Sequence, residues 1–322
     1  MRVLITEPID PSAEDFLRSH GYEVIVGSRG QFDTEDAIIE GLTGCDGAIT
    51  MLSNPMTDRV FQSVPNLKIV ANYAVGFNNI DLTAAKKHDV KVSNTPDVLS
   101  EATADIALGL LLGVSRKLVE AEQDLKKGLF DGWHPQGYVG TEIHGKTAGM
   151  IGMGRIGSAI VRRLNGFGVK TLYTNRNQVD KQIESELNVT FVADVDELLS
   201  NIDFLFLSCP LTPQTHHIID SKRLQSLGKH VIIINTGRGP LIDEAALAKA
   251  LHEGTIAGAG LDVFEREPEI HPDLLTAPNT MLLPHIGSAT RETRRNMAML
   301  AAQSVFKILS GVHPNSIKNL IA

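Results

Sequence analysis

Residues 147–157 read TAGMIGMGRIG, a short apolar run that leads into the pattern G-x-G-x-x-G. Between a strand and a helix, Gly152 permits a tight turn, Gly154 lets a pyrophosphate approach the backbone, and Gly157 lets the helix pack closely on the sheet. The three glycines alone are weak evidence, because glycine-rich turns also arise for steric reasons. The apolar strand before them and the helical pattern after them make a dinucleotide the expected ligand.

The residues after the next strand, 169–174, bear on which dinucleotide is bound. An NAD-binding unit carries an acid here that accepts hydrogen bonds from the ribose 2′-hydroxyl. This chain has Asn175 and Arg176, and the next acid, Asp180, lies six residues beyond the strand. A guanidinium pairs with a 2′-phosphate, which a carboxylate repels. We therefore expect NADP(H) to be preferred and NAD(H) to be possible, the alternative being that Arg176 is an ordinary surface charge.

The composition is typical of a soluble globular enzyme of roughly two domains. Of the 322 residues, 43% are hydrophobic and 21% charged, and the net charge of −8 argues against nucleic-acid binding. Cys45 and Cys209 are too few for a disulfide framework or a structural zinc site, and no metal is expected. The longest apolar run, 106–114, is far below the ~20 residues of a membrane span. We expect no membrane contact, no signal peptide and a cytoplasmic location.

Short apolar strands alternate with helical patterns along the chain, which predicts an α/β fold with parallel sheets. The economical interpretation is two doubly wound units, Rossmann-like or flavodoxin-like. Because the glycine motif opens the second set of strands, the nucleotide domain, 100–286, is predicted to be inserted into a substrate domain made of 1–99 and 287–322. The expected strands are 3–6, 23–26, 47–51, 68–71, 90–93, 147–151, 170–174, 204–208, 230–235, 258–261 and 281–283.

Two long helices are expected at the places where the chain passes between these domains. The first, 101–128, is apolar on nearly every face over residues 102–114, which predicts burial all round, between the domains or in a subunit interface. We favour both, and hence a homodimer, the commonest assembly of soluble oligomers. The second helix, 291–309, returns the chain to the first domain.

Three segments follow buried strands, 235–240, 262–268 and 284–290, and each carries a charged or titratable residue that is a candidate for catalysis. These are Arg238, Glu267 and His285, at the sheet edge where open α/β folds bind ligands. Taken alone, each residue has a simpler structural interpretation, as a surface arginine, a charged residue in a turn and a buried histidine respectively. Their joint occurrence at three strand ends favours a catalytic site. An imidazole can protonate an alkoxide, a nearby carboxylate favours the imidazolium, and a guanidinium fork holds a planar carboxylate.

With these segments, the chain resembles the D-isomer-specific 2-hydroxyacid dehydrogenases, and most of all the glyoxylate/hydroxypyruvate reductases. The resemblance spans essentially the whole chain and includes AVGFNNID at 74–81 and PLTP at 210–213. It implies that Arg238 holds the substrate carboxylate and carbonyl, that His285 is the acid/base, and that Glu267 orients His285.

The resemblance also implies roles for backbone groups. Val75 and Gly76 would offer N–H groups to the substrate carboxylate, and Asp262 would contact the cofactor together with the backbone from Thr236 to Arg238. The further residues expected to contact the cofactor are Thr103, Arg155, Ile156, Asn175, Pro210, Gly237 and Gly287.

The substrate class follows from what similar enzymes carry. Leu52 and Ser53 lie in the loop where phosphoglycerate dehydrogenases have a cation for the phosphate, and this loop has none. Glu267 is replaced in the related formate dehydrogenases, which need no proton transfer. The segment around Trp133 resembles one that reaches a neighbouring subunit's substrate pocket in hydroxypyruvate reductases. A small 2-oxo acid such as glyoxylate or hydroxypyruvate is favoured; the alternatives are another D-2-hydroxy acid or a non-catalytic, nucleotide-sensing, corepressor-like protein.

Overall fold

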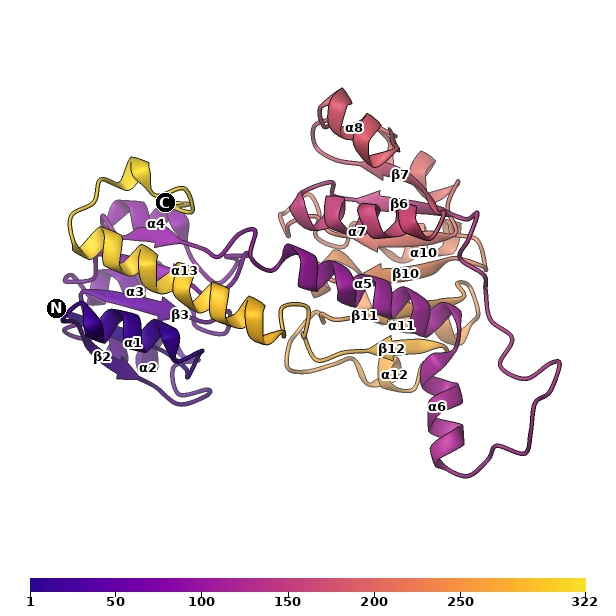
Figure 1. Cartoon of the computed structure of the whole chain (residues 1–322), viewed down its shortest axis with the longest axis horizontal. Coiled ribbons are helices and arrows are strands. Elements are labelled where there is room, and N and C mark those ends of the chain that lie inside the picture. Colours follow the sequence, from indigo (N-terminus) through magenta and orange to yellow (C-terminus); the bar gives the residue numbers. More distant parts are fainter. The chain divides into compact units, whose positions relative to one another are not determined.

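The computed structural model describes residues 1–322, which divide into two compact units (Figure 1). The outer unit consists of Met1–Leu99 and Ala289–Ala322, and the inserted unit is Ser100–Ser288. The chain returns to the outer unit at Ala289, two residues later than the predicted boundary at 287. No helix combines the length and the apolar character that a membrane crossing requires.

The outer unit is built on a five-stranded parallel sheet with the order β2-β1-β3-β4-β5. Its central strands are buried on both faces, as helices on both sides of a parallel sheet require. Helix α13 returns from the inserted unit and packs on α1, β3 and β4. The strands are β1 (Arg2–Ile5), β2 (Glu23–Val26), β3 (Gly47–Thr50), β4 (Ile69–Asn72) and β5 (Lys91–Ser93). The helices are α1 (Ser12–Ser19), α2 (Glu35–Leu42), α3 (Asp58–Ser63), α4 (Leu82–Lys87), α13 (Arg291–Leu309) and the short η2 (Pro314–Ser316).

The inserted unit holds a seven-stranded parallel sheet with the order β12-β11-β10-β9-β6-β7-β8. Counted from β6, six of these strands have the 3-2-1-4-5-6 order of a dinucleotide-binding fold, with β12 added at one edge. The strands are β6 (Thr147–Ile151), β7 (Lys170–Thr174), β8 (Val189–Phe191), β9 (Phe204–Leu207), β10 (Ile232–Asn235), β11 (Gly258–Leu261) and β12 (Thr280–Leu282). The α/β class and the two doubly wound units predicted from the sequence are confirmed.

The inserted unit also contains nine helical segments. Four of them begin after an aspartate whose carboxylate accepts a backbone N–H of the first turn, which explains where they start. Helix α5 lies along α7 (Figure 1) and also contacts β10 and β11. The helices are α5 (Ser100–Ser115), α6 (Leu118–Lys126), α7 (Arg155–Gly166), α8 (Lys181–Leu187), α9 (Val195–Leu199), α10 (Ser221–Ser226), the short η1 (Gly239–Leu241), α11 (Glu244–His252) and α12 (Pro272–Leu275).

Three expectations about elements were wrong or incomplete. The single helix expected at 101–128 is two helices, because Lys117 takes a left-handed conformation with φ 53° and ends α5 before α6 begins. The α5 helix is also not buried all round, since Glu101, Asp105 and Gly109 form one exposed stripe along it. Arg163 of α7 binds Glu101 and Asp105, so the stripe carries ion pairs. The three-residue strand β8 was missed.

Candidate active site

A histidine and a glutamate form a hydrogen-bonded pair beyond the ends of β11 and β12. His285 Nδ1 lies 2.8 Å from Glu267 Oε2, and the two side chains are 34% and 37% exposed. The other oxygen, Oε1, accepts the N–H of Phe264 at 3.0 Å. Glu267 is therefore fixed by its own loop at one oxygen and can hold the imidazole with the other.

The surroundings keep this carboxylate charged. Burial by itself would favour the neutral acid, but the hydrogen bond from His285, the charge of His285, the Phe264 N–H and the charge of Arg238 together outweigh it. The pKa of Glu267 is consequently lowered.

Asp262 holds the chain that carries His285. Its Oδ1 accepts the N–H of Ile286 and its Oδ2 accepts that of Gly287, both at 2.7 Å. Burial raises the pKa of Asp262, while the two N–H groups favour its charged form. A Cβ on Gly287 would lie 3.0 Å from Asp262 Oδ2 and 3.3 Å from a methyl carbon of Thr103, so the segment is closely packed here. The sequence predicts that Asp262 contacts the cofactor, but it gives no sign of these two hydrogen bonds to the backbone next to His285.

The loop after β10 presents Arg238. The side-chain amide of buried Asn235 accepts the Gly237 N–H at 3.0 Å and donates to the Arg238 carbonyl at 2.9 Å, which fixes the turn. The guanidinium donates to the Gly237 carbonyl at 2.7 Å through Nη1. Burial lowers the pKa of Arg238 and the charge of Glu267 opposes that shift, but an arginine remains charged in either case.

The glycine after Arg238 brings two of these loops together. A Cβ on Gly239 would lie 1.9 Å from the carbonyl carbon and oxygen of Phe264, a distance that no side chain can occupy. The backbone that follows Arg238 thus packs directly on the backbone that precedes Glu267. This close packing of Gly239 was not predicted from the sequence. The only available signal was that the glycine directly follows Arg238.

The glycine motif forms the turn between β6 and α7. Gly152 has φ 101°, and a Cβ there would lie 2.5 Å from the backbone nitrogen of Cys209. A Cβ on Gly157 would lie 2.3 Å from the carbonyl oxygen of Gly152, so both glycines are required by the packing of the protein itself. Gly154 differs, because a Cβ there would have no atom within 4 Å. The open space beside Gly154 and the start of α7 at Arg155 fit a dinucleotide pyrophosphate.

The end of β7 carries a cation and no carboxylate free to bind a ribose. Asn175 and Arg176 are both exposed, and the guanidinium of Arg176 has no partner within the chain. Asp180 is occupied as the N-cap of α8, where it accepts the Gln182 N–H at 2.8 Å. Asn175 donates its amide to the carbonyl of Asn177.

The remaining residues predicted to contact the cofactor lie in the inserted unit and differ in burial. Thr103 and Thr236 are buried, at the start of α5 and directly after β10. Ile156 is half-buried in the first turn of α7. Pro210 is exposed, and its carbonyl accepts the Thr215 hydroxyl at 2.7 Å.

In the outer unit, Val75 and Gly76 form a short loop after β4 with unused N–H groups. The buried amides of Asn94 and Asn72 donate to their carbonyls, each at 2.8 Å, and no hydrogen bond within the chain uses their N–H groups. Successive free N–H groups of this kind bind anions.

The other predicted substrate residues lie on the surface in loops. Leu52 and Ser53 are in the turn after β3 of the outer unit, half-buried and exposed respectively. Trp133, in the inserted unit, is 84% exposed.

Comparison with known proteins identifies the family of the chain. Residues 108–287 match the family model described as the NAD binding domain of D-isomer specific 2-hydroxyacid dehydrogenase. The chain belongs to this family. The glyoxylate reductase of Thermococcus onnurineus is 43% identical to it over 99% of this chain and 96% of that protein.

Two solved structures have the same fold over nearly their full lengths. A Thermus thermophilus protein superposes with a TM-score of 0.92 at 38% identity, covering all of both chains. The NADPH-dependent glyoxylate/hydroxypyruvate reductase of Sinorhizobium meliloti, in complex with NADP and malonate, gives a TM-score of 0.86 at 35% identity, covering 96% of this chain and 94% of that one.

Proposed function

We propose that this dehydrogenase reduces a small 2-oxo acid, glyoxylate or hydroxypyruvate, to the 2-hydroxy acid with NADPH as the preferred reductant. The observation that carries the proposal is the hydrogen bond of 2.8 Å between His285 Nδ1 and Glu267 Oε2. With Nδ1 held by the carboxylate, Nε2 is the nitrogen that can exchange a proton with substrate. This is the arrangement that a general acid for carbonyl reduction needs.

His285 donates a proton from Nε2 to the carbonyl oxygen as that oxygen becomes an alkoxide. Glu267 favours the imidazolium form that makes the donation and fixes the tilt of the ring. When bound, the nicotinamide supplies the hydride that reduces the carbonyl carbon. Oxidation of the 2-hydroxy acid reverses these roles, and neutral His285 then accepts the proton.

Arg238 binds the substrate carboxylate. Its guanidinium can make two parallel hydrogen bonds to a planar carboxylate, which fixes the carbonyl face presented to the hydride. The Asn235 amide supports this role because it fixes the backbone on both sides of Arg238.

The residues available for the cofactor are those of the glycine turn and of the β7 end. The pyrophosphate would lie beside Gly154, against the N–H groups of Arg155 and Ile156 at the start of α7. Arg176 would bind the 2′-phosphate of NADPH, a role that its exposure and its lack of a partner within the chain support. The NADPH dependence of the Sinorhizobium relative is in line with this preference.

One relative and the loop after β3 both favour a small substrate without a phosphate group. The Thermococcus relative is a glyoxylate reductase. Leu52 and Ser53 provide no cation for a substrate phosphate, so we propose an unphosphorylated acid.

Steady-state reduction of glyoxylate by His285→Ala and Arg238→Lys tests these roles. His285→Ala should lose about 10²–10⁴ in kcat and still bind oxamate, an unreactive analogue of a small 2-oxo acid, because Arg238 remains. Arg238→Lys keeps the charge but not the fork, and should raise KM as well as slow the reaction. A fully active His285→Ala enzyme would remove His285 from the mechanism.

A further inference from the structure

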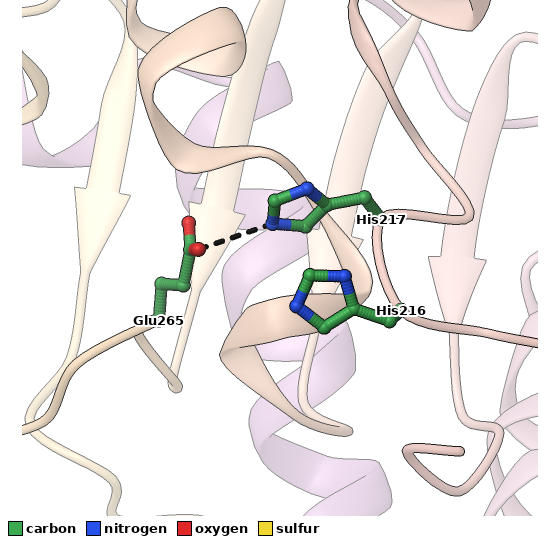
Figure 2. A group of neighbouring side chains, drawn as sticks. All are labelled: His216, His217 and Glu265. Carbon is green, nitrogen blue, oxygen red and sulfur yellow. Dashed lines mark hydrogen bonds and ion pairs between the residues drawn. The ribbon is translucent and has the colours of Figure 1, made fainter. Parts of the chain in front are cut away.

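A second group of titratable side chains lies outside the proposed catalytic residues. His216 and His217 are consecutive in the segment between β9 and α10, and Glu265 follows β11 (Figure 2). His217 Nε2 lies 3.1 Å from Glu265 Oε1, and the two imidazole rings lie with their centroids 4.0 Å apart and their planes tilted by 32°. One possible ligand atom from each residue lies within 4.8 Å of the others. Figure 2 shows both rings directing one nitrogen toward the carboxylate.

The backbone places both histidines on the same side. In an extended chain, consecutive side chains point to opposite faces. His217 instead has φ 48°, in the left-handed region that few residues other than glycine adopt, and its N–H donates to the Pro240 carbonyl at 2.8 Å. His216 is tied in the same way, because its N–H donates to the Thr212 carbonyl at 2.9 Å. Such strained conformations are concentrated at functional sites.

Glu265 is also held in place. Its Oε2 accepts the N–H of Glu244 at 3.2 Å, and its own N–H donates to the Glu244 carboxylate at 2.7 Å. Glu244 is buried and additionally accepts the N–H of His271. One oxygen of Glu265 is therefore bound to the backbone, which leaves Oε1 directed at His217. Outer hydrogen bonds of this kind orient the ligands of metal sites.

His216 distinguishes this group from an ordinary ion pair. A pair between His217 and Glu265 alone would account for their contact, but His216 is exposed and its ring makes no hydrogen bond, although it lies against His217. A cation shared by both rings would give it a partner.

We propose that His216, His217 and Glu265 bind one divalent transition-metal ion of the Zn²⁺ type. Two imidazoles and a carboxylate are a known donor set for Zn²⁺ with one coordination position left for water, whereas Mg²⁺ and Ca²⁺ prefer oxygen donors throughout. Metal–ligand distances of ~2.0–2.1 Å in a tetrahedron require ligand atoms about 3.3 Å apart. The contact between His217 and Glu265 already meets this, and only the exposed His216 ring has to move inward.

The spacing in the sequence gives no sign of this site. Adjacent histidines normally diverge, and Glu265 is 48 residues from His217. Only the turn at His217 and the adjacent positions of β9, β10 and β11 in the sheet bring the three together, which is why the sequence predicts no metal.

Equilibrium Zn²⁺ binding tests the proposal. The untagged protein, stripped with a chelator and desalted, is titrated with Zn²⁺ in competition with a chromophoric chelator, and with Co²⁺ to record the absorption of tetrahedral cobalt. We expect one equivalent bound and a tetrahedral Co²⁺ spectrum. His216→Ala and Glu265→Gln should each weaken binding by at least ~10-fold, since even outer-shell changes at metal sites cost 10–100-fold.

Two controls keep the result specific. His285→Ala removes the other histidine–glutamate pair, which has no second imidazole, and should leave Zn²⁺ affinity unchanged. His216→Ala should retain glyoxylate reduction, which shows that the variant is folded. The proposal is overturned if no stoichiometric binding is found, if His216→Ala binds Zn²⁺ as tightly as the parent, or if His285→Ala is the variant that loses it.

Discussion

Glu267 is the residue through which charge acts on the proposed proton donor. Burial opposes its ionisation, yet the contacts with His285, Phe264 and Arg238 lower its pKa, so the carboxylate stays negative throughout the neutral range. In the proposed mechanism this negative charge lies against the imidazole that donates the proton, 2.8 Å from His285 Nδ1.

The first prediction concerns Glu267→Gln, which removes this charge and keeps the shape. Reduction needs charged His285 and fails as pH rises, so loss of the favourable charge should move the alkaline limit of reduction to lower pH. Oxidation of the 2-hydroxy acid should begin at correspondingly lower pH. The measurement is kcat/KM for glyoxylate against pH in both proteins. If the alkaline limb stays in place, Glu267 only positions the ring.

The second prediction concerns Arg176. If it binds the 2′-phosphate, Arg176→Ala should cost about 1.5–3 kcal/mol, or roughly 10- to 100-fold, in NADPH affinity and leave NADH affinity nearly unchanged. Arg116→Ala, which removes another exposed arginine of the inserted unit, is the matched control. Titration of cofactor fluorescence measures both affinities. An equal loss for NADPH and NADH would mean that Arg176 does not read the phosphate.

At the scale of single residues, the positions of the candidate catalytic side chains could be predicted from the sequence, but the tertiary contacts that hold them could not. Arg238, Glu267 and His285 were located because each follows an apolar strand that the sequence reveals. The two hydrogen bonds that Asp262 accepts from Ile286 and Gly287 could not be predicted, because they join residues 24 and 25 positions apart and depend on how β11 pairs with β12. The fit of Gly239 against Phe264 depends on tertiary packing in the same way.

At the scale of elements, the turn between β6 and α7 contains one glycine that the packing of the protein requires, Gly157, and one that only a bound ligand would require, Gly154. Gly157→Ala sets a Cβ 2.3 Å from the Gly152 carbonyl oxygen and should destabilise the protein. Gly154→Ala meets no atom of the protein within 4 Å, and its φ of −86° suits alanine.

The third prediction is that Gly154→Ala lowers cofactor affinity, whereas Gly157→Ala lowers the stability of the protein. Gly154→Ala should keep the parent's melting temperature and lose NADPH affinity, because the methyl group occupies the space proposed for the pyrophosphate. Gly157→Ala should melt at lower temperature. Thermal unfolding and cofactor titration are measured on both, and a Gly154→Ala protein with normal NADPH binding would argue against this position for the phosphates.

Most elements could be predicted because apolar strands and amphipathic helices have distinct periods. The exceptions have local causes. The helix break at Lys117 contains neither proline nor glycine, so nothing in the sequence marks it. The strand β8 is three residues long and follows a left-handed Asn188, too short to give a periodic pattern.

For the whole molecule, the surface of residues 118–139 is the feature that bears on assembly. Seven of the fifteen exposed large apolar side chains lie in this segment. Apolar side chains concentrated in this way are typical of an interaction site. They are Leu118, Leu125, Leu129, Phe130, Trp133, Tyr138 and Val139.

The fourth prediction is that the protein is a homodimer held by this segment. Sedimentation equilibrium should give twice the chain mass of 34.9 kDa, and Phe130→Asp should shift it to the monomer. Leu275→Asp alters an equally exposed leucine elsewhere and should remain dimeric. A monomeric parent, or a dimer that persists with Phe130→Asp, would contradict this role.

The central claim is reduction of a small 2-oxo acid with NADPH. The measurement that tests it most directly is kcat/KM for glyoxylate reduction by the unmodified protein, with NADPH and with NADH under the same conditions. The account predicts turnover with both and a preference for NADPH of roughly 10- to 100-fold, the value expected from one charged hydrogen-bonding contact at Arg176. Equal values for the two cofactors, or no reduction with either, would contradict it.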